Sequence, residues 1–302
     1  MRNNSTRGLQ ERDNHLQGEG DQPVGLERLC SLKQDVIWSA PAEEGVERIE
    51  ARFQGNGFEP HRHDTYAIGL TISGVQTFEY RGERRASLPG QVIVIHPDEL
   101  HDGGAGSELG LRYRMIYIPP ELIAKAADFG GRGALPFVNS PVLSDLNFRQ
   151  TLAEALEDID LSLGALKRDA LLADLAACLE RHAEGRKARQ SSLDWPALNL
   201  CAQFLRENIC EQVRGEQLEA LAQMDRFTLS RQFRAAFGTS PHRFLVMRRL
   251  ERVRTALAAG GSLAETAIEN GFADQSHMSR HFKRTYGMAP GRWRQLSAAN
   301  GR

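Results

Sequence analysis

The sequence predicts a two-domain α+β protein. Its first domain is an antiparallel β-barrel with helices at its C-terminal end, and its second is an all-α domain with two helix-turn-helix motifs joined by a long helix. Three observations predict this architecture. Apolar residues alternate in short runs through residues 46–118, as in antiparallel strands. Beyond residue 141 they recur with helical spacing, and the last third of the chain contains an internal repeat with an offset of 49 residues.

The composition is that of an ordinary globular protein. A chain of 302 residues suggests two domains, and 41% hydrophobic with 25% charged residues excludes collagen-like and fully disordered chains. The first 22 residues contain no hydrophobic signal core and no run reaches about 18 apolar residues, so we expect a cytoplasmic protein with no membrane contact. No CxxC pair occurs among the four cysteines, which indicates reduced, packed thiols: Cys30, Cys178, Cys201 and Cys210.

The N-terminal half divides into a tail, a barrel and a helical segment. Residues 1–25 are polar and are expected to form a disordered tail. Residues 26–140 are assigned to the barrel, because Gly and Pro separate the short apolar runs. Leucines at helical spacing in residues 141–184 predict two amphipathic helices, which could simply cover one side of the barrel. The polar residues 185–194 follow as a linker.

Charge is distributed unevenly along the chain. The net charge of the whole chain is −1 at pH 7. Residues 191–302 contain 16 Arg and Lys against 10 Asp and Glu, a net charge of +6, which leaves −7 for residues 1–190. A basic half joined to an acidic half indicates that the C-terminal part meets a polyanion.

The internal repeat defines the architecture of the basic half. Ser230, Arg231, Phe233 and Gly238 return as Ser279, Arg280, Phe282 and Gly287, and Asp225 returns as Asp274. Each copy contains a short amphipathic helix, at residues 216–223 and 263–270, then a turn and an Asp suited to cap a second helix. This helix-turn-helix arrangement is typical of proteins that read the major groove of DNA.

The second helix of each copy has an apolar face and a cationic or polar face. At about 100° per residue, Leu229, Phe233 and Phe237 share one side, as do Met278, Phe282 and Tyr286. The opposite sides carry Phe227, Arg231 and Arg234 in the first copy and Ser276, Arg280 and Lys283 in the second. Arginine and short polar groups suit base edges and phosphates, whereas the plainer interpretation is a solvated helix face.

The two copies are joined by one predicted helix. Residues 241–259 contain no internal Gly or Pro, so they form a helix of about 26 to 28 Å. Such a strut could hold the two recognition helices near one DNA turn apart, about 34 Å. One chain would then contact two adjacent segments of the major groove.

One run of the second copy carries a family resemblance. Residues 271–283 have the sequence GFADQSHMSRHFK, followed by Gly287 and Pro290, and closely resemble the C-terminal signature of the AraC/XylS family of bacterial transcription regulators. The resemblance covers residues 195–297. It implies base-reading side chains early in each recognition helix, namely Phe227, Ser230 and Arg231 in the first copy and Gln275, Ser276, Ser279 and Arg280 in the second.

The N-terminal half resembles a cupin barrel. His61, His63 and His101 lie where metal-binding cupins place histidine ligands, but Ala67 stands where those proteins have a glutamate. Three imidazoles alone can hold zinc or iron, so a metal-dependent cupin enzyme or a metal sensor fused to a DNA-binding module is the alternative. Because sensor barrels of this family keep such histidines without metal, we expect no metal and no cofactor. The expected effector-binding residues are His61, His63, Tyr66, His96 and His101.

These observations predict a regulator and not an enzyme. The chain contains no nucleophile elbow, phosphate-binding loop or paired-carboxylate motif. We expect a sequence-specific transcriptional activator that binds double-stranded promoter DNA and responds to a small-molecule effector in the barrel. The resemblance implies a homodimer formed through residues 141–184 and, for an activator, contact with RNA polymerase. A further alternative is constitutive DNA binding with a protein partner sensed at the barrel surface.

Overall fold

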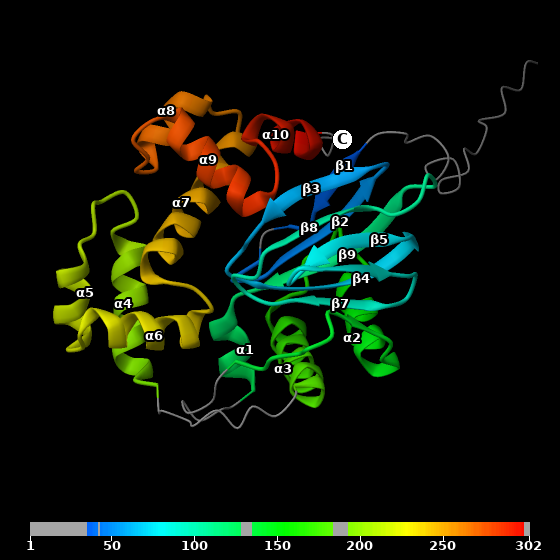
Figure 1. Cartoon of the computed structure of the whole chain (residues 1–302), viewed down its shortest axis with the longest axis horizontal. Coiled ribbons are helices and arrows are strands. Elements are labelled where there is room, and N and C mark those ends of the chain that lie inside the picture. The colour runs from blue at the N-terminus through cyan, green and yellow to red at the C-terminus, as the bar shows by residue number, and fades with distance from the viewer. Residues whose placement is uncertain (1–34, 42, 128–134, 184–192, 299–302) are drawn as a thin grey trace, which may run out of the picture. The chain divides into compact units, whose positions relative to one another are not determined.

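The computed structural model describes residues 35–41, 43–127, 135–183 and 193–298 (Figure 1), all within one compact unit, Gln34–Arg302. The predicted tail 1–25 and most of the predicted linker 185–194 lie outside the described residues. No helix in the described ranges combines the length and apolar character needed to cross a bilayer. Cys178 and Cys201 are buried and Cys210 is exposed, all as free thiols, whereas Cys30 lies outside the description.

The N-terminal domain consists of two antiparallel sheets, as the alternating pattern predicts. The six-stranded sheet has the order β1-β2-β9-β4-β7-β10 and the four-stranded sheet the order β3-β8-β5-β6. Their strands are β1 Val36–Ser39, β2 Glu47–Phe53, β3 Asn56–His61, β4 Tyr66–Gly74, β5 Gln76–Tyr80, β6 Glu83–Ser87, β7 Val92–Ile95, β8 His101–Ala105, β9 Leu111–Ile118 and β10 Val142–Leu143.

The six-stranded sheet is covered on both faces, and this explains the continuous apolar runs of β4 and β7. Ala67 on β4 belongs to the interior apolar cluster together with Phe78 of the other sheet. The neighbouring Ile68 belongs to a second cluster, which includes the leucines of the covering helices. Successive residues of one strand therefore enter two different cores, as the period of two requires.

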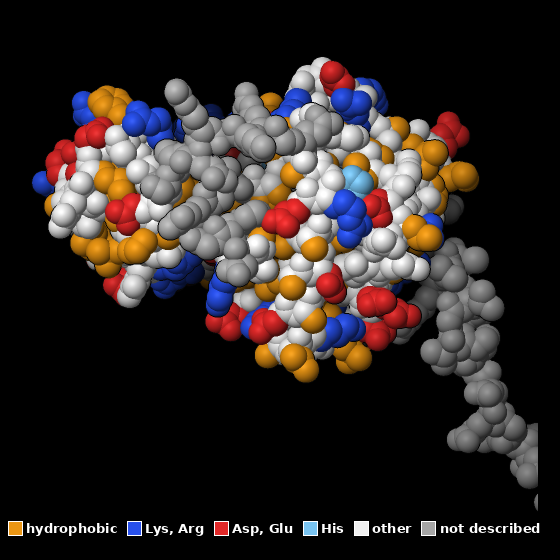
Figure 2. All heavy atoms as spheres, turned by 90° about the horizontal axis from the view of Figure 1, so that it is seen from below, with side chains coloured by type: hydrophobic (Ala, Val, Ile, Leu, Met, Phe, Trp, Pro, Cys, Tyr) orange, Lys and Arg blue, Asp and Glu red, His pale blue; other side chains and the backbone are white. Residues whose placement is uncertain are grey.

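Three helices supply the second of these cores: α1 Pro120–Ala126, α2 Leu146–Leu156 and α3 Ala165–His182 (Figure 1). Leu152, Leu175 and Leu179 are fully buried in it. The apolar faces of α2 and α3 thus pack on the sheet of their own chain. Seen from below, the surface over these helices mixes acidic, basic and scattered apolar side chains (Figure 2).

Two of these elements carry no clear sequence signal. The strand β10 pairs with β7 through only two residues, which is too short for a period to be visible. It extends the sheet past the predicted domain end at residue 140. The helix α1 starts with Pro120 at its first turn and is only seven residues long, which is also too short for a helical period to be visible.

The C-terminal helices confirm the predicted repeat. They are α4 Trp195–Glu207, α5 Gly215–Ala222, α6 Arg226–Phe237, α7 Pro241–Ala258, α8 Leu263–Glu269, α9 Gln275–Tyr286 and α10 Pro290–Ala298. Asp225 caps α6 by accepting from the amides of Phe227 and Thr228, and Asp274 caps α9 by accepting from that of His277. Both helices end at a left-handed glycine. The 18 residues of α7 make a rod of about 27 Å between the two motifs.

Candidate functional site

The recognition helix of the first motif, α6, presents the predicted polar face. Leu229, Phe233 and Phe237 are buried, in agreement with the helical wheel. Arg231 and Arg234 are exposed on the opposite face, and Ser230 is half-buried. Phe227 is 65% exposed, an unusual position for a large ring unless it meets a partner.

The second recognition helix, α9, has the same division of faces. Met278 and Phe282 are buried, whereas Gln275, Ser276 and Arg280 are exposed. Ser279 is half-buried at the border between the two faces. The side chains that the sequence assigned to DNA are therefore available at the N-terminal end of this helix.

One residue assigned to DNA already has a partner within the chain. The ammonium group of Lys283 lies 2.7 Å from a carboxylate oxygen of Glu59 on β3. Both side chains remain about half exposed, so the ion pair is weak and salt-sensitive. Lys283 can reach a phosphate only after it leaves Glu59.

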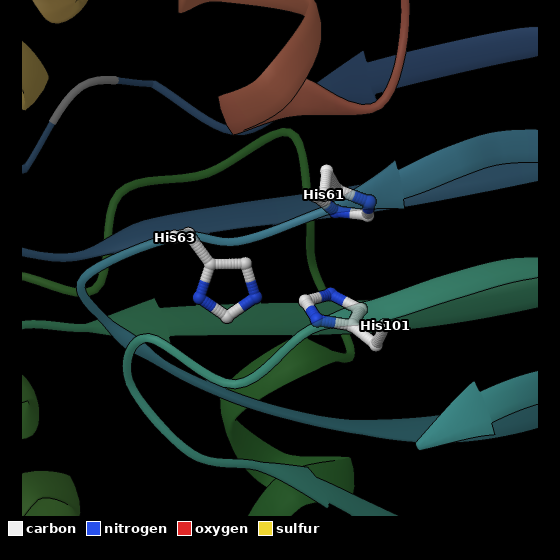
Figure 3. Close-up of side chains that lie close together, drawn as sticks. All are labelled: His61, His63 and His101. Carbon is white, nitrogen blue, oxygen red and sulfur yellow. The ribbon is translucent and has the colours of Figure 1, made fainter. Parts of the chain in front are cut away.

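The structure brings together three of the predicted effector-binding histidines. His61 ends β3, His63 follows it, and His101 begins β8 on the neighbouring strand, so the three rings gather around one space (Figure 3). Their ring centroids are 4.2 to 6.1 Å apart, and one nitrogen of each ring lies within 4.8 Å of the others. All three side chains are buried.

Backbone carbonyls hold the three rings in one tautomer. The Nδ1–H of His61 donates to the carbonyl of Glu59 at 2.8 Å, and that of His101 donates to the carbonyl of Glu99 at 2.9 Å. His63 likewise donates to the carbonyl of Thr65 at 2.8 Å. Each ring thereby carries its lone pair on Nε2, since a neutral imidazole has one donor and one acceptor nitrogen.

The histidine cluster is neutral and incompletely satisfied. Burial, followed by the neighbouring His101, holds the pKa of His61 and of His63 well below the usual range, and burial lowers the pKa of His101 to about 4. The Nε2 of His63 is buried and has no hydrogen-bond partner. Leaving a buried acceptor in that state costs about 1 to 3 kcal/mol, so this nitrogen calls for an explanation.

The other two predicted effector-binding residues lie elsewhere in the domain. The hydroxyl of Tyr66 donates to the carbonyl of Pro136 at 2.8 Å, and its ring packs in the core under the helices. His96 bonds the hydroxyl of Tyr80 at 3.0 Å and accepts from the amide of Val138 at 3.0 Å. Neither residue borders the cavities beside the histidine cluster. Their polar groups instead bind the 135–138 segment. Consecutive residues of a strand face opposite sides of a sheet, so Tyr66 on β4 faces away from the cavity that its neighbour Ala67 borders.

A cavity that is partly open to solvent lies beside the cluster. The sheet domain and the second helix-turn-helix region both supply its walls, which combine apolar and charged side chains. They are Ile37, Ser39, Glu47, Ile49, Phe58, His61, His63, Asp64, Thr65 and Tyr117 from the sheet domain, and Met247, Glu251, Arg254, Thr285, Tyr286 and Trp293 from the helices.

Two arginines of α7 connect this helix to the sheet domain beside the cavity. Arg254 forms an ion pair with Glu47 and stacks on the rings of Tyr286 and Trp293. Burial opposes its charge, but Glu47 outweighs that effect and raises the pKa of Arg254 above its usual range. Arg248 binds Asp64 at 2.7 Å in a buried pair. From its sequence α7 was predicted only as a spacer, and neither arginine was among the predicted site residues, although charged residues on its partly apolar face were a visible signal.

Comparisons with known proteins agree with this arrangement. Residues 44–176 match the family described as AraC-like ligand binding domain, and residues 218–296 match a helix-turn-helix domain. The chain is 28% identical to the uncharacterised HTH-type transcriptional regulator YbfI of Bacillus subtilis, covering 76% of this chain and 86% of that protein. It is 26% identical to the HTH-type transcriptional activator RhaR of Klebsiella pneumoniae, covering 83% and 92%.

A solved structure has the same fold across most of the chain. ToxT from Vibrio cholerae superposes with a TM-score of 0.59 at 13% identity, covering 84% of this chain and 99% of that one. Two domain matches in this order, together with the repeated motif, account for both halves of the molecule. The chain therefore belongs to the AraC/XylS family and is a transcriptional regulator, not an enzyme, with a ligand-binding domain followed by a helix-turn-helix DNA-binding domain.

Proposed function

We propose that this regulator activates transcription from specific promoters in the cytoplasm, and that a small effector in the cavity beside the histidine cluster controls it. The observation that carries the proposal is the composition of the cavity walls. A molecule bound there touches the sheet domain and the helices α7, α9 and α10 at the same time. It can therefore favour one arrangement of the DNA-binding helices over another.

The cavity walls suggest the chemical character of the effector. Ile49, Phe58 and Trp293 provide apolar surface, whereas His61 and Arg254 provide polar groups. Sites of this kind bind small molecules with an apolar body and one or two oriented polar groups. An effector shifts the equilibrium only by its difference in affinity for the two arrangements, so contacts with both domains are required.

On the DNA, we assign the two recognition helices to adjacent major-groove segments. Arg231 and Arg280 occupy equivalent exposed positions and suit guanine edges, which an arginine can bind with two hydrogen bonds. Arg234 and Lys283 lie farther along each helix and suit phosphates. The intervening α7 sets the separation of the two contacts.

The assembly belongs to the same proposal. We assign the homodimer contact to the outer faces of α2 and α3, where Leu146 and Leu166 are 58% and 87% exposed. RNA polymerase is the partner of an activator bound at a promoter. The name of RhaR, a transcriptional activator, supports activation over repression.

The first test is a selection from random DNA duplexes with the full-length protein at two salt concentrations. We expect two enriched sequence blocks about 10 base pairs apart, because the two motifs face successive turns. Enrichment that is absent, or that vanishes at the higher salt, would contradict sequence-specific binding by both motifs. The selected operator is then placed before a reporter gene, whose output should rise above that of cells without the regulator.

The second test asks whether the cavity receives the effector. Small molecules are screened with the reporter, and Ser39→Phe is compared with the native protein, because Ser39 is an exposed side chain at the cavity edge. We expect Ser39→Phe to abolish the response while DNA binding persists. Ser73→Phe, an exposed serine on β4 away from the cavity, is the matched control and should respond normally. A full response by Ser39→Phe would place the effector elsewhere.

A further inference from the structure

The buried histidine cluster has the features of a metal centre. Its three rings come from the end of β3, from His63 just after that strand and from the start of the paired strand β8, and they converge on one space (Figure 3). Each ring uses Nδ1–H on a backbone carbonyl, which is how proteins orient a histidine whose Nε2 binds a metal. The Nε2 of His63 is buried without a partner, so a polar atom points into the space with nothing to bind it.

We propose that His61, His63 and His101 hold one divalent metal ion of the zinc class through their Nε2 atoms. Neutral imidazoles suit zinc, copper, iron and nickel, whereas calcium and magnesium require oxygen ligands. Tetrahedral zinc with bonds of 2.0 to 2.1 Å needs ligand nitrogens about 3.4 Å apart. The ring nitrogens now lie within 4.8 Å of one another, so the rings must close by up to about 1.4 Å when they bind the ion.

The environment of the cluster leaves the ion one open position. Ala67 occupies the place where metal-binding cupins carry a glutamate, and it borders a second cavity together with His61 and His101. The two nearest carboxylates in sequence are already engaged, Asp64 by Arg248 and Asp102 by the amide of Glu79. Three protein ligands and one open position are the arrangement in which a metal still binds an exogenous ligand.

This proposal reverses the expectation drawn from the sequence. The missing glutamate favoured histidines without metal, since the family resemblance points to sensor barrels that lack one. The unpartnered Nε2 and the three matching carbonyl contacts favour a ligand set of three instead. The ion would be part of the sensor and would act in no reaction.

The test uses the full-length protein, stripped with a chelator and then titrated with Co²⁺ and Zn²⁺. We expect one equivalent of Co²⁺ to give the visible absorption of tetrahedral cobalt, and Zn²⁺ to displace it. X-ray absorption of the zinc form should show three imidazole nitrogens at 2.0 to 2.1 Å. Neither measurement depends on a variant that has to fold. Absence of binding at micromolar metal, or sulfur among the ligands, would overturn the proposal.

Two variants separate this site from surface histidines. His63→Gln removes the unpartnered nitrogen and should abolish the stoichiometric cobalt spectrum and the rise in Tm with Zn²⁺. The pair His277→Gln with His281→Gln removes the only other described histidines whose Nε2 atoms meet, 3.1 Å apart on α9, and should leave both signals intact. The opposite pattern, with metal lost only from the α9 variant, would overturn the assignment.

Discussion

The two helix-turn-helix motifs share a sequence pattern but differ in how the sheet domain meets them. At the end of α9, the amide of Glu59 donates to the carbonyl of Gly287 at 2.8 Å, and the amide of Arg62 donates to that of Arg284 at 3.0 Å. Lys283 adds its ion pair with Glu59. On α6 the equivalent of Lys283 is Arg234, which has no carboxylate partner in the described part of the chain.

The terminal glycines show the same difference. Both have a positive φ, and both ends approach the sheet domain closely. A Cβ on Gly287 would lie 2.7 Å from the carbonyl oxygen of Glu59 and 2.8 Å from Nδ1 of His61. A Cβ on Gly238 would lie 2.4 Å from the Cβ of Pro97, an apolar contact. The second motif is therefore bonded to β3, the strand that ends at His61.

The largest expected effect comes from the two arginines that we assign to base contacts. Arg231→Ala and Arg280→Ala should each cost about 1 to 3 kcal/mol in affinity for the selected operator and relax the sequence preference. Without effector, the loss of operator affinity should be greater for Arg231→Ala than for Arg280→Ala. The reason is that the contacts between β3 and α9 restrict how the second motif binds DNA. Fluorescence anisotropy with operator and random duplexes measures both losses.

Two results would break this interpretation. Equal losses on operator and on random DNA would mean that these arginines contact phosphates and no bases. Equal losses for the two variants on the operator without effector would mean that the contacts with β3 do not weaken DNA binding by the second motif. Arg234→Ala is the phosphate control and should weaken binding to both duplexes and flatten the salt dependence.

A smaller effect is expected when the ion pair on α9 is removed. Glu59→Gln frees Lys283, so affinity for random DNA should rise about 2- to 5-fold at low salt, with the slope of log K against log salt steeper by about 0.9. Glu83→Gln is the matched control, because it removes one carboxylate and frees Arg85 within the sheet domain. If both variants behaved alike, the gain would reflect net charge and not the release of Lys283.

The smallest effect concerns pH. The second motif carries His277 and His281 where the first has Thr228 and Gln232. His277 accepts from the amide of Ala273 through Nδ1, so its Nε2–H donates to Nε2 of His281 at 3.1 Å. Partial burial, and then His277, lower the pKa of His281 to about 4.

A folded-state pKa below the usual 6.5 means that the unfolded chain binds this proton more readily. Stability should therefore fall as the pH decreases from about 6.5 to about 4. His281→Gln, which introduces the residue of the first motif, should reduce the decline of Tm over this range. An unchanged decline would show that other groups cause the acid sensitivity.

Much of the DNA-binding half could be predicted because its signals are local. The Asp caps, the terminal glycines and the buried Leu229 and Met278 follow from spacings of a few residues, which a helix converts directly into faces. The candidate effector site was predicted less well. His61, His63 and His101 meet, but Tyr66 and His96 serve the opposite side of the sheet, a distinction that depends on strand register.

The sequence alone determined the two-domain order, the repeated motif and the family, since each of them follows from residue types at fixed spacings. Only the tertiary structure decided which segments share a cavity. Glu47 meets Arg254 and Asp64 meets Arg248 across about two-thirds of the chain, and Lys283 meets Glu59. Such contacts depend on how the helices pack against β2 and β3, and no local pattern encodes that packing.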